Sequence, residues 1–496
     1  MLQWLRAVAH PLLLIGPALT NTNSALVVPA ACVVASQQMP GHAVAHWHSP
    51  VDSRWVTEAQ QADAALVARA VGQAQDAAPA MAKMSGLERA AGLLRVADAV
   101  RADAESLAGL MARETGKTLR EARTELQRAD SVLRLCAEEA TRIQGRHIPL
   151  DASALGHGRM AVSQRFPLGV VALIVPFNAP INLSCHKLGP ALATGNPFVL
   201  KSPPEAAGTV SRLFEHVRQA GFPAGAVNLV HGGAEVGRAL VDDERVAFIS
   251  FTGSLGAGRA VKAAAGLRPC VLELGGVGPT LVHADADLTA AARACAAAGF
   301  RLAGQSCASV QNIFAHHSVA DRFEELLLQQ VQALRVGDPL DERTDLGPVI
   351  HEAAARRIVA SVQAAVATGA LLRCGGGRDG LYVQPTVLAQ VDWRSPMACQ
   401  EIFGPVVNVH RYADVEAVIE WVRHTRMGIN LGLFTSSIEL ALHMHRHSQV
   451  GAVVLNASST FRPDQLPYGG DGLSGYGREC PAESVRAMTR ERILVL

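Results

Sequence analysis

The chain has 496 residues, a formal net charge of +1 and only 4% aromatic residues. A chain of this length can bury a large core and is expected to divide into two or three domains. A charge so close to zero favours neither nucleic acid nor an acidic membrane surface, so neither partner is expected. No apolar run reaches the roughly 20 residues that a membrane-spanning helix needs. Abundant alanine and glycine favour closely packed helices in a large α/β enzyme.

The cysteine pattern excludes two further classes of protein. The nine cysteines are odd in number, scattered, and never spaced as C-x-x-C. We therefore expect no disulfide framework and no metal site, and a location in the reducing cytoplasm. All but Cys307 are expected to be small buried hydrophobic residues.

Residues 1–38 differ from the rest of the chain. Short apolar patches at Leu12–Ile15 and Ala25–Val28 are interrupted by prolines, and Arg6 alone supplies positive charge. These features match a secretory signal only poorly. We expect an N-terminal extension, disordered or produced by an early start assignment with Met39 as a later start. A targeting segment is the alternative.

Two regions of different predicted structure follow: a helical region and then a short stretch with turns and a strand. From about Ala59 to Ile143, apolar residues recur at spacings of three and four, which predicts helices with a solvated charged face. Residues 150–166 contain turn signals and an alternating stretch, Met160–Phe166, which indicates a strand.

From Gly169 onward strands and helices alternate. Strands are predicted at 170–175, 198–200, 226–230 and 246–251, with helices at 181–193, 206–220 and 236–240 between them. This alternation is typical of a doubly wound parallel sheet, which binds ligands at the carboxyl ends of its strands. Gly253-Ser254-Leu255-Gly256-Ala257-Gly258 opens a helix directly after a strand. It would suit a pyrophosphate, although a simple tight turn is the alternative.

Two stretches carry the chemistry. Cys307 lies in Arg301–Gln311, a run of mostly small and polar residues that leaves a thiol accessible. Glu273 lies between two leucines and precedes Gly275-Gly276, so burial should raise its pKa toward the range of a general base. A thiol nucleophile and a tuned carboxylate together indicate an acyl-forming site.

These stretches resemble the E-L-G-G and G-Q-x-C motifs of the aldehyde dehydrogenase superfamily. Further matches follow in order along the chain: Pro176–Pro180, Lys201, Phe251–Ser254, Gln400–Pro405, Pro467–Gly470 and Ser474–Glu479. The resemblance implies an α/β fold in three parts. A doubly wound dinucleotide-binding domain would span 39–149 and 167–275, a second α/β catalytic domain 276–475, and a small β oligomerisation arm 150–166 and 476–496. Homodimers or homotetramers are implied.

The resemblance also implies catalytic roles. Cys307 would attack the aldehyde to give a thiohemiacetal and then a thioester, which water activated by Glu273 would hydrolyse to a free acid. Asn178 would help to bind the oxyanion, with a turn residue between Phe177 and Pro180 as the alternative. Lys187 and Glu479 match positions assigned to proton relay, with an ordinary ion pair as the alternative.

NAD or NADP is the implied cofactor. Lys201 would donate to the adenosine ribose, Glu401 would accept from the nicotinamide ribose, and Phe403 would lie beside the nicotinamide. Pro204 stands where many NAD-preferring relatives carry an acid, which leaves NADP open. The remaining candidate cofactor residues are Val175, Pro176, Phe177, Gly253, Ser254, Gly258 and Leu274.

The end of the chain and the residues around Cys307 resemble the branch that handles small polar or anionic aldehydes. Phosphonoacetaldehyde is one candidate, and lactaldehyde, sulfoacetaldehyde and semialdehydes are alternatives. An anionic substrate needs arginines, and Arg123, Arg301 and Arg462 are candidates by position, with ordinary surface arginines as the alternative. A cysteine-dependent esterase or a non-catalytic cofactor-binding relative are more distant possibilities.

Overall fold

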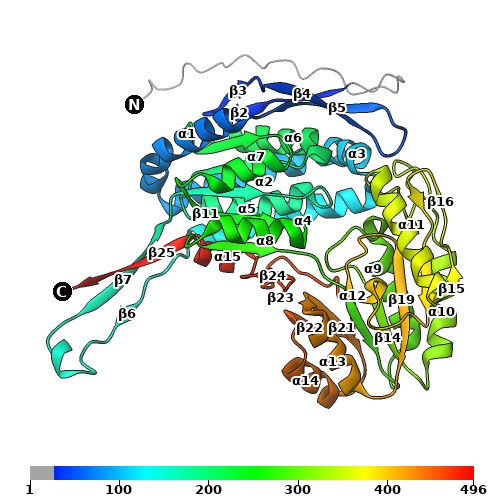
Figure 1. Cartoon of the computed structure of the whole chain (residues 1–496). Helices are drawn as coiled ribbons and strands as arrows, with labels where there is room; N and C mark the ends of the chain where they lie inside the picture. The colour runs from blue at the N-terminus through cyan, green and yellow to red at the C-terminus, as the bar shows by residue number, and fades with distance from the viewer. Residues whose placement is uncertain (1–26) are drawn as a thin grey trace, which may run out of the picture.

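The computed structural model describes residues 27–496, which form two α/β units and a projecting β arm (Figure 1). The targeting alternative for the N-terminus falls largely on residues 1–26, outside this range. Among residues 27–496, no helix combines the length and apolar character that a membrane crossing requires.

The first unit is built on an eight-stranded sheet in the order β24-β12-β11-β8-β9-β10-β2-β3. Its five central strands are parallel, while β24, β2 and β3 at the edges run antiparallel to their neighbours. The strands are β24 (Gly475–Tyr476), β12 (Cys270–Glu273), β11 (Val246–Thr252), β8 (Val170–Ile174), β9 (Phe198–Lys201), β10 (Val227–Val230), β2 (Cys32–Val34) and β3 (Gln37–Met39).

Helices cover both faces of this sheet, as the predicted doubly wound fold requires. In β8, Val171 and Leu173 join one hydrophobic cluster, while Val170, Ala172 and Ile174 join the other. Side chains of a strand alternate between its faces, so a fully apolar strand needs cover on both sides. One face packs mainly on α1 (Ala64–Lys83), α7 (Ala234–Asp242) and α8 (Leu255–Ala265). The other packs on α2 (Gly86–Ala102), α3 (Ala104–Thr115), α4 (Leu119–Ala140), α5 (Pro180–Ala193) and α6 (Ala207–Arg218).

Local sequence signals fix the ends of these helices. Ser85 with Glu88, and Thr118 with Glu121, form capping boxes at the starts of α2 and α4. Gly116 ends α3 in the left-handed conformation, which glycine adopts easily. The helical layer therefore confirms the periodicity seen in the sequence.

The structure differs from the predicted domain boundaries at both ends. Residues 28–38, placed in an extension, belong to the fold: β2 and β3 extend the large sheet, and β1 (Val28–Ala30) pairs with β5 (Trp55–Gln61), which also pairs with β4 (Ala43–His48). The strand β5 occupies the start of the region predicted as helical. Near the C-terminus, α15 (Pro481–Ala487) packs on α4 and α5, so it belongs to the first unit and not to the arm.

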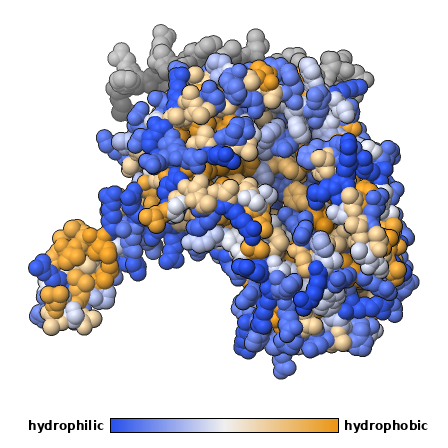
Figure 2. Space-filling view, viewed as in Figure 1, coloured by the Kyte–Doolittle hydropathy of each residue, from blue (hydrophilic) through white to orange (hydrophobic). Residues whose placement is uncertain are grey.

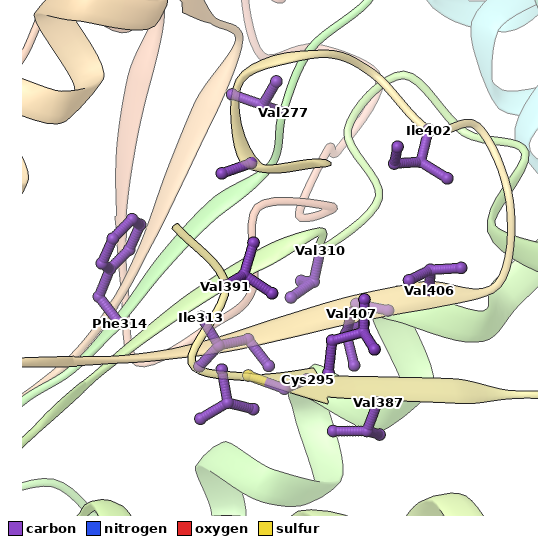
Figure 3. Packing of buried hydrophobic residues seen from close by; sticks show 14 of the residues in the cluster. Val277, Cys295, Val310, Ile313, Phe314, Val387, Val391, Ile402, Val406 and Val407 are labelled. Atoms are coloured by element: carbon purple, nitrogen blue, oxygen red, sulfur yellow. The ribbon is translucent and has the colours of Figure 1, made fainter. Parts of the chain in front are cut away.

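The second unit has a seven-stranded sheet in the order β15-β18-β19-β14-β13-β21-β22. Its core contains Cys295 of α9 (Leu288–Phe300), which Figure 3 shows among valines and isoleucines of the same cluster. The strands are β15 (Leu371–Cys374), β18 (Thr386–Ala389), β19 (Val406–Tyr412), β14 (Asn312–His316), β13 (Pro279–Val282), β21 (Asn430–Phe434) and β22 (Ala452–Leu455). The other helices are α10 (Ala320–Gln332), α11 (Glu352–Ala367), α12 (Pro396–Cys399), α13 (Val415–Thr425) and α14 (Ile438–His447).

The arm is a three-stranded sheet in the order β25-β7-β6. The strand β7 (Ala161–Pro167) pairs along its whole length with β25 (Thr489–Val495), and the short β6 (His147–Ile148) lies on its other side. The tip carries exposed apolar side chains, seen as an orange patch at the lower left of Figure 2. Among the cysteines, Cys374 and Cys399 are only half-buried, which corrects the expectation that both are core residues.

Candidate active site

Cys307 lies in a tightly folded loop that follows α9. A short 3-10 segment, η3 (Arg301–Gly304), brings the chain to it through left-handed backbone at Leu302, Ala303 and Gly304. A Cβ atom on Gly304 would overlap the Gly404 carbonyl oxygen, so only glycine fits there. A left-handed backbone conformation costs free energy in a residue other than glycine, so it persists only where the surrounding structure enforces it. The surroundings therefore fix where the thiol lies.

Hydrogen bonds from three directions hold this loop. The Leu302 N–H donates to Glu121 Oε1 at 2.7 Å, and Gln305 Oε1 accepts from the Ile350 N–H at 3.0 Å. Asn178 Nδ2 donates to the Gln305 carbonyl oxygen at 2.9 Å. The loop is thus tied to the helical layer, to the second unit and to the end of the β8 strand.

Glu273 ends β12 and is only 2% exposed. Neither of its carboxylate oxygens has a hydrogen-bond partner among the described residues. Burial, followed by the negative charge of Glu479, raises the pKa of Glu273 well above its usual range, although Arg462 and Lys187 oppose this. A buried carboxyl with a raised pKa and no partner is what a general base for a water molecule requires.

One cavity of about 500 Å³ brings the two groups together. Cys307 and Glu273 line it, together with Asn178, Glu401 and Phe403 from separate parts of the chain. The pKa of the Cys307 thiol is raised by burial, while Tyr468 and Arg462 lower it. The cavity therefore brings together a thiol, a buried carboxyl group and a side-chain amide, three groups that can support acyl chemistry.

Asn178 follows β8 and precedes α5. Its Nδ2 is engaged with the Gln305 carbonyl, whereas its Oδ1 is buried without a partner among the described residues. The side chain lines the same cavity as Cys307. The oxyanion role of Asn178 therefore stays a prediction, for which the second hydrogen of Nδ2 is the donor still free.

Lys187 and Glu479 form a buried ion pair. Lys187 Nζ lies 2.6 Å from Glu479 Oε1 and 3.2 Å from Ser250 Oγ. Arg462 donates to the other carboxylate oxygen of Glu479 at 3.0 Å. Burial would raise the pKa of Glu479, but the charges of Lys187 and Arg462 lower it overall. The arrangement is that of a stable ion pair, the alternative considered for these two residues.

The predicted nucleotide residues gather at the carboxyl ends of the first sheet. Pro176, Phe177, Gly253, Ser254 and Leu274 line the Cys307 cavity. The others lie beside them: Val175 and Lys201 are buried at the ends of β8 and β9, and Gly258 in α8 leaves space for Leu274.

Glu401 carries a second signal of a ligand site. One of its carboxylate oxygens is buried without a partner among the described residues, and burial raises its pKa to about 7. A Cβ atom on Gly275 would overlap this carboxylate, so glycine is needed for their close approach. Phe403, in left-handed backbone, meets Phe177 edge to face at 6.1 Å between ring centroids. The Glu401 carboxylate is thus available for the hydroxyl groups of a ribose.

The structure separates the three candidate arginines. Arg301 and Arg462 line the Cys307 cavity, but Arg123 does not. Arg123 is instead bound to Glu105 and Glu342 on the surface, which is the surface role considered for it. Arg301 also lines a neighbouring cavity of about 430 Å³, and its buried Nε has no hydrogen-bond partner among the described residues.

Two cavity residues escaped sequence reasoning. Arg128 lines both cavities and bonds to Asp464 at 2.6 Å. Tyr468 places its hydroxyl 3.1 Å from Cys307 Sγ. Arg128 lies near the buried apolar stripe of α4, so helical periodicity could have indicated that it faces the interior. Tyr468 lies inside the motif Pro467–Gly470, so its position in that motif could have indicated a place in the site. No group of three or more His, Cys, Asp or Glu in residues 27–496 is arranged to hold a metal ion.

Comparison with known proteins assigns the chain to a family. Residues 38–494 match the family described as the aldehyde dehydrogenase family. A 3-sulfolactaldehyde dehydrogenase of Priestia aryabhattai is 41% identical over 87% of this chain and 90% of its own length. A sulfoacetaldehyde dehydrogenase of Neptuniibacter caesariensis is 34% identical over 84% and 91%.

A solved structure shows the same fold. The NADP-dependent glyceraldehyde-3-phosphate dehydrogenase of Bacillus halodurans, complexed with NADP, has a TM-score of 0.92 and 31% identity, covering 94% of this chain and 99% of its own. Fold and site together define an oxidoreductase that uses NAD or NADP. The chain belongs to the aldehyde dehydrogenase family.

Proposed function

We propose that this aldehyde dehydrogenase oxidises a small anionic aldehyde to the free carboxylic acid, with a sulfonated aldehyde such as 3-sulfolactaldehyde as the leading substrate. The relatives named above for sulfolactaldehyde and sulfoacetaldehyde support a sulfonate. Phosphonoacetaldehyde, lactaldehyde and semialdehydes remain predictions from the sequence.

The observation that carries the proposal is the Arg301 side chain. Its guanidinium makes no ion pair with any carboxylate among the described residues, and its Nε is buried without a partner. A buried polar group normally finds a hydrogen-bond partner, so a ligand is expected to supply one here. Arg128 and Arg462 line the same cavity but are engaged by Asp464 and Glu479. Arg357 also lines it, without an ion pair to any described carboxylate, but this residue is exposed to solvent. An anionic oxygen of the substrate is therefore expected to bind Arg301 first, because guanidinium groups favour sulfonate, phosphonate and carboxylate geometry.

The chemistry follows from the groups in the cavity. The Cys307 sulfur forms a bond to the aldehyde carbon, and the carbonyl electron pair moves to the oxygen, where the Asn178 amide and nearby backbone N–H groups stabilise it. After loss of hydride the product is a thioester on Cys307. Glu273 then takes a proton from water, the water oxygen attacks the thioester carbon, and the C–S bond breaks. The acid leaves and the thiolate is restored.

The chain's residues also fit a dinucleotide. Lys201 and Glu401 would hold the two riboses, and Ser254 with the start of α8 would face the pyrophosphate. When bound, NAD or NADP accepts the hydride. The unpartnered Glu401 oxygen and the glycine contact at Gly275 support this fit. Lys201 is buried, which lowers its pKa, whereas the charges of Glu205 and Glu235 raise it.

The test is a substrate panel with one matched pair of variants. Purified protein is supplied with NAD or NADP and with sulfonated, phosphonated, carboxylated, hydroxylated and neutral aldehydes, and reduced nicotinamide is followed by absorbance. Arg301→Gln should raise KM for the preferred anionic aldehyde about 10- to 100-fold, since a charge-assisted hydrogen bond contributes about 1.5–3 kcal/mol. Arg123→Gln, on the surface, should behave like the unaltered protein. Equal KM values in both variants, or a preference for neutral aldehydes, would contradict the proposal.

We also infer that the arm joins copies of this chain into a homodimer or homotetramer. Leu155, Ile493 and Leu494 at its tip are exposed, and Leu155 is 95% exposed. A strand pair with such an apolar surface gains free energy when another copy covers it. The cytoplasmic location also remains a prediction. All nine cysteines are free thiols, which supports it.

A further inference from the structure

A tyrosine hydroxyl lies against the sulfur of the proposed nucleophile. The Tyr468 hydroxyl oxygen is 3.1 Å from Cys307 Sγ, and the ring is buried against Ala308 and Ile429. This is the single hydrogen bond that the hydroxyl makes within residues 27–496. Neither the motifs nor the mechanism above uses this hydroxyl.

Three contacts hold the tyrosine in this orientation. Its backbone N–H and carbonyl oxygen pair with the backbone of Glu479 in an antiparallel bridge, at 3.1 and 2.6 Å. The guanidinium carbon of Arg462 lies 3.8 Å from the centre of its ring. Gly469, the next residue, lets the backbone come close to Glu273, since an added Cβ would lie 2.9 Å from Glu273 Oε1. The hydroxyl is therefore oriented before any ligand binds.

We propose that Tyr468 is a further catalytic residue, whose hydroxyl donates a hydrogen bond to the Cys307 thiolate and holds the sulfur ready for attack. This inference rests on the proposed function, in which Cys307 is the nucleophile. The direction of the hydrogen bond follows from ordinary acidities, because a thiol ionises near pH 8.5 and a phenol near pH 10. When the thiol loses its proton, the phenol keeps its own and donates a hydrogen bond to the thiolate.

The charges around the pair favour this assignment. Burial raises the pKa of Cys307, as do the nearby carboxylates Glu401 and Glu273. The hydrogen bond from Tyr468 and the positive charge of Arg462 act against that effect. Burial also raises the pKa of Tyr468 well above its usual range, so the hydroxyl keeps its proton. Glu479 balances the charge of Arg462 without touching the sulfur.

The hydrogen bond also fits the covalent step. The Cys307 thiol first loses its proton to solvent water, the sulfur electron pair then forms the bond to the aldehyde carbon, and the carbonyl electron pair moves to oxygen. The sulfur is then no longer anionic, so its hydrogen bond from Tyr468 weakens while the C–S bond forms. The phenol proton stays on Tyr468 throughout, and the step needs no further reactant.

The experiment measures the thiolate directly, without aldehyde or nucleotide. The full chain is alkylated with iodoacetamide between pH 5 and 10, and modification of Cys307 is quantified by peptide mass spectrometry. In Tyr468→Phe the pH profile should move upward by about one to two units, and the rate at pH 7 should fall about 10- to 100-fold. Tyr476→Phe is the matched control, because that tyrosine is exposed beside Lys262. Its profile should equal that of the unaltered chain.

A second measurement covers the case in which Tyr468→Phe fails to fold. The chain has only four tyrosines, so 3-fluorotyrosine can replace all of them with little change in shape. A fluorinated phenol is a stronger donor, and the alkylation profile of Cys307 should move to lower pH. The inference is overturned if both profiles superimpose on that of the unaltered chain, or if Tyr468→Phe lowers the apparent pKa. Failure of the proposed function would look different: Cys307 would still alkylate normally, but no aldehyde would reduce NAD or NADP.

Discussion

Replacing Glu273 by glutamine should separate catalysis from stability at one position. The substitution keeps the shape of a side chain that is 2% exposed and removes the carboxylate, whose oxygens have no partner among the described residues. Loss of a general base costs about 10²- to 10⁴-fold in rate. We therefore expect kcat to fall by that factor while acyl-Cys307 accumulates, because the thioester still forms but is no longer hydrolysed.

Stability should change in the opposite direction. The raised pKa of Glu273 means that the folded chain binds this proton more tightly than the unfolded chain. Protonated Glu273 contributes fully to the free energy of unfolding below the pKa that the group has in the unfolded chain. This contribution is lost as the pH rises through the higher pKa of the folded chain. At pH values above the folded-state pKa, each unit of the pKa shift lowers the free energy of unfolding by about 1.4 kcal/mol. Glu273→Gln should therefore melt at a higher temperature than the unaltered chain at pH 8, and at a similar temperature at pH 4.5.

The assays are intact-protein mass spectrometry after mixing with substrate and cofactor, and thermal unfolding at the two pH values. Glu342→Gln, on the surface, is the matched control. Retention of kcat within tenfold without an acyl-enzyme would refute the assignment of the base. A melting temperature that falls equally at both pH values would refute the argument from burial.

Three further predictions concern the frame of the site. Gly304→Ala should lower the free energy of unfolding by more than about 1 kcal/mol in denaturant titrations and abolish activity, since its Cβ would overlap the Gly404 carbonyl; an unchanged midpoint would contradict this. Lys187→Met leaves Glu479 with Arg462 as its remaining cationic partner and should cost about 1.5–3 kcal/mol by the same assay, with partial recovery when Glu479→Gln is added; equal stability of the single variant would argue against the ion pair. Ile493→Asp should shift the chain toward monomer in size-exclusion chromatography with light scattering, whereas an unchanged mass would count against assembly through the arm.

The fold was largely predictable because strands buried on both faces are continuously apolar. The strands and helices from Val170 to Thr252 lie within a few residues of their predicted limits for this reason. The strands between Val28 and Met39 escaped prediction, because three-residue segments are too short to show a period. The pairing of β2 with β10 also depends on a contact about 200 residues along the chain.

Part of the site was predictable and part was not. Cys307 and Glu273 stood out because each is chemically unusual for its surroundings. Arg123 and Arg301 look alike in sequence, and only the packing of α4 against the second unit decides that one faces solvent and the other the cavity. The contact between Tyr468 and Cys307 joins residues 161 positions apart, so no local pattern reports it.

The late return of the chain has a consequence for biosynthesis. The strand β24 pairs beside Glu273, and Glu479 meets Lys187 across 292 residues. A growing polypeptide on the ribosome can form most of both sheets before these segments emerge. Until then the nucleophile lacks its tyrosine and the buried lysine lacks its counterion. The activation of the thiol that we propose for Tyr468 is therefore possible only when synthesis is almost complete.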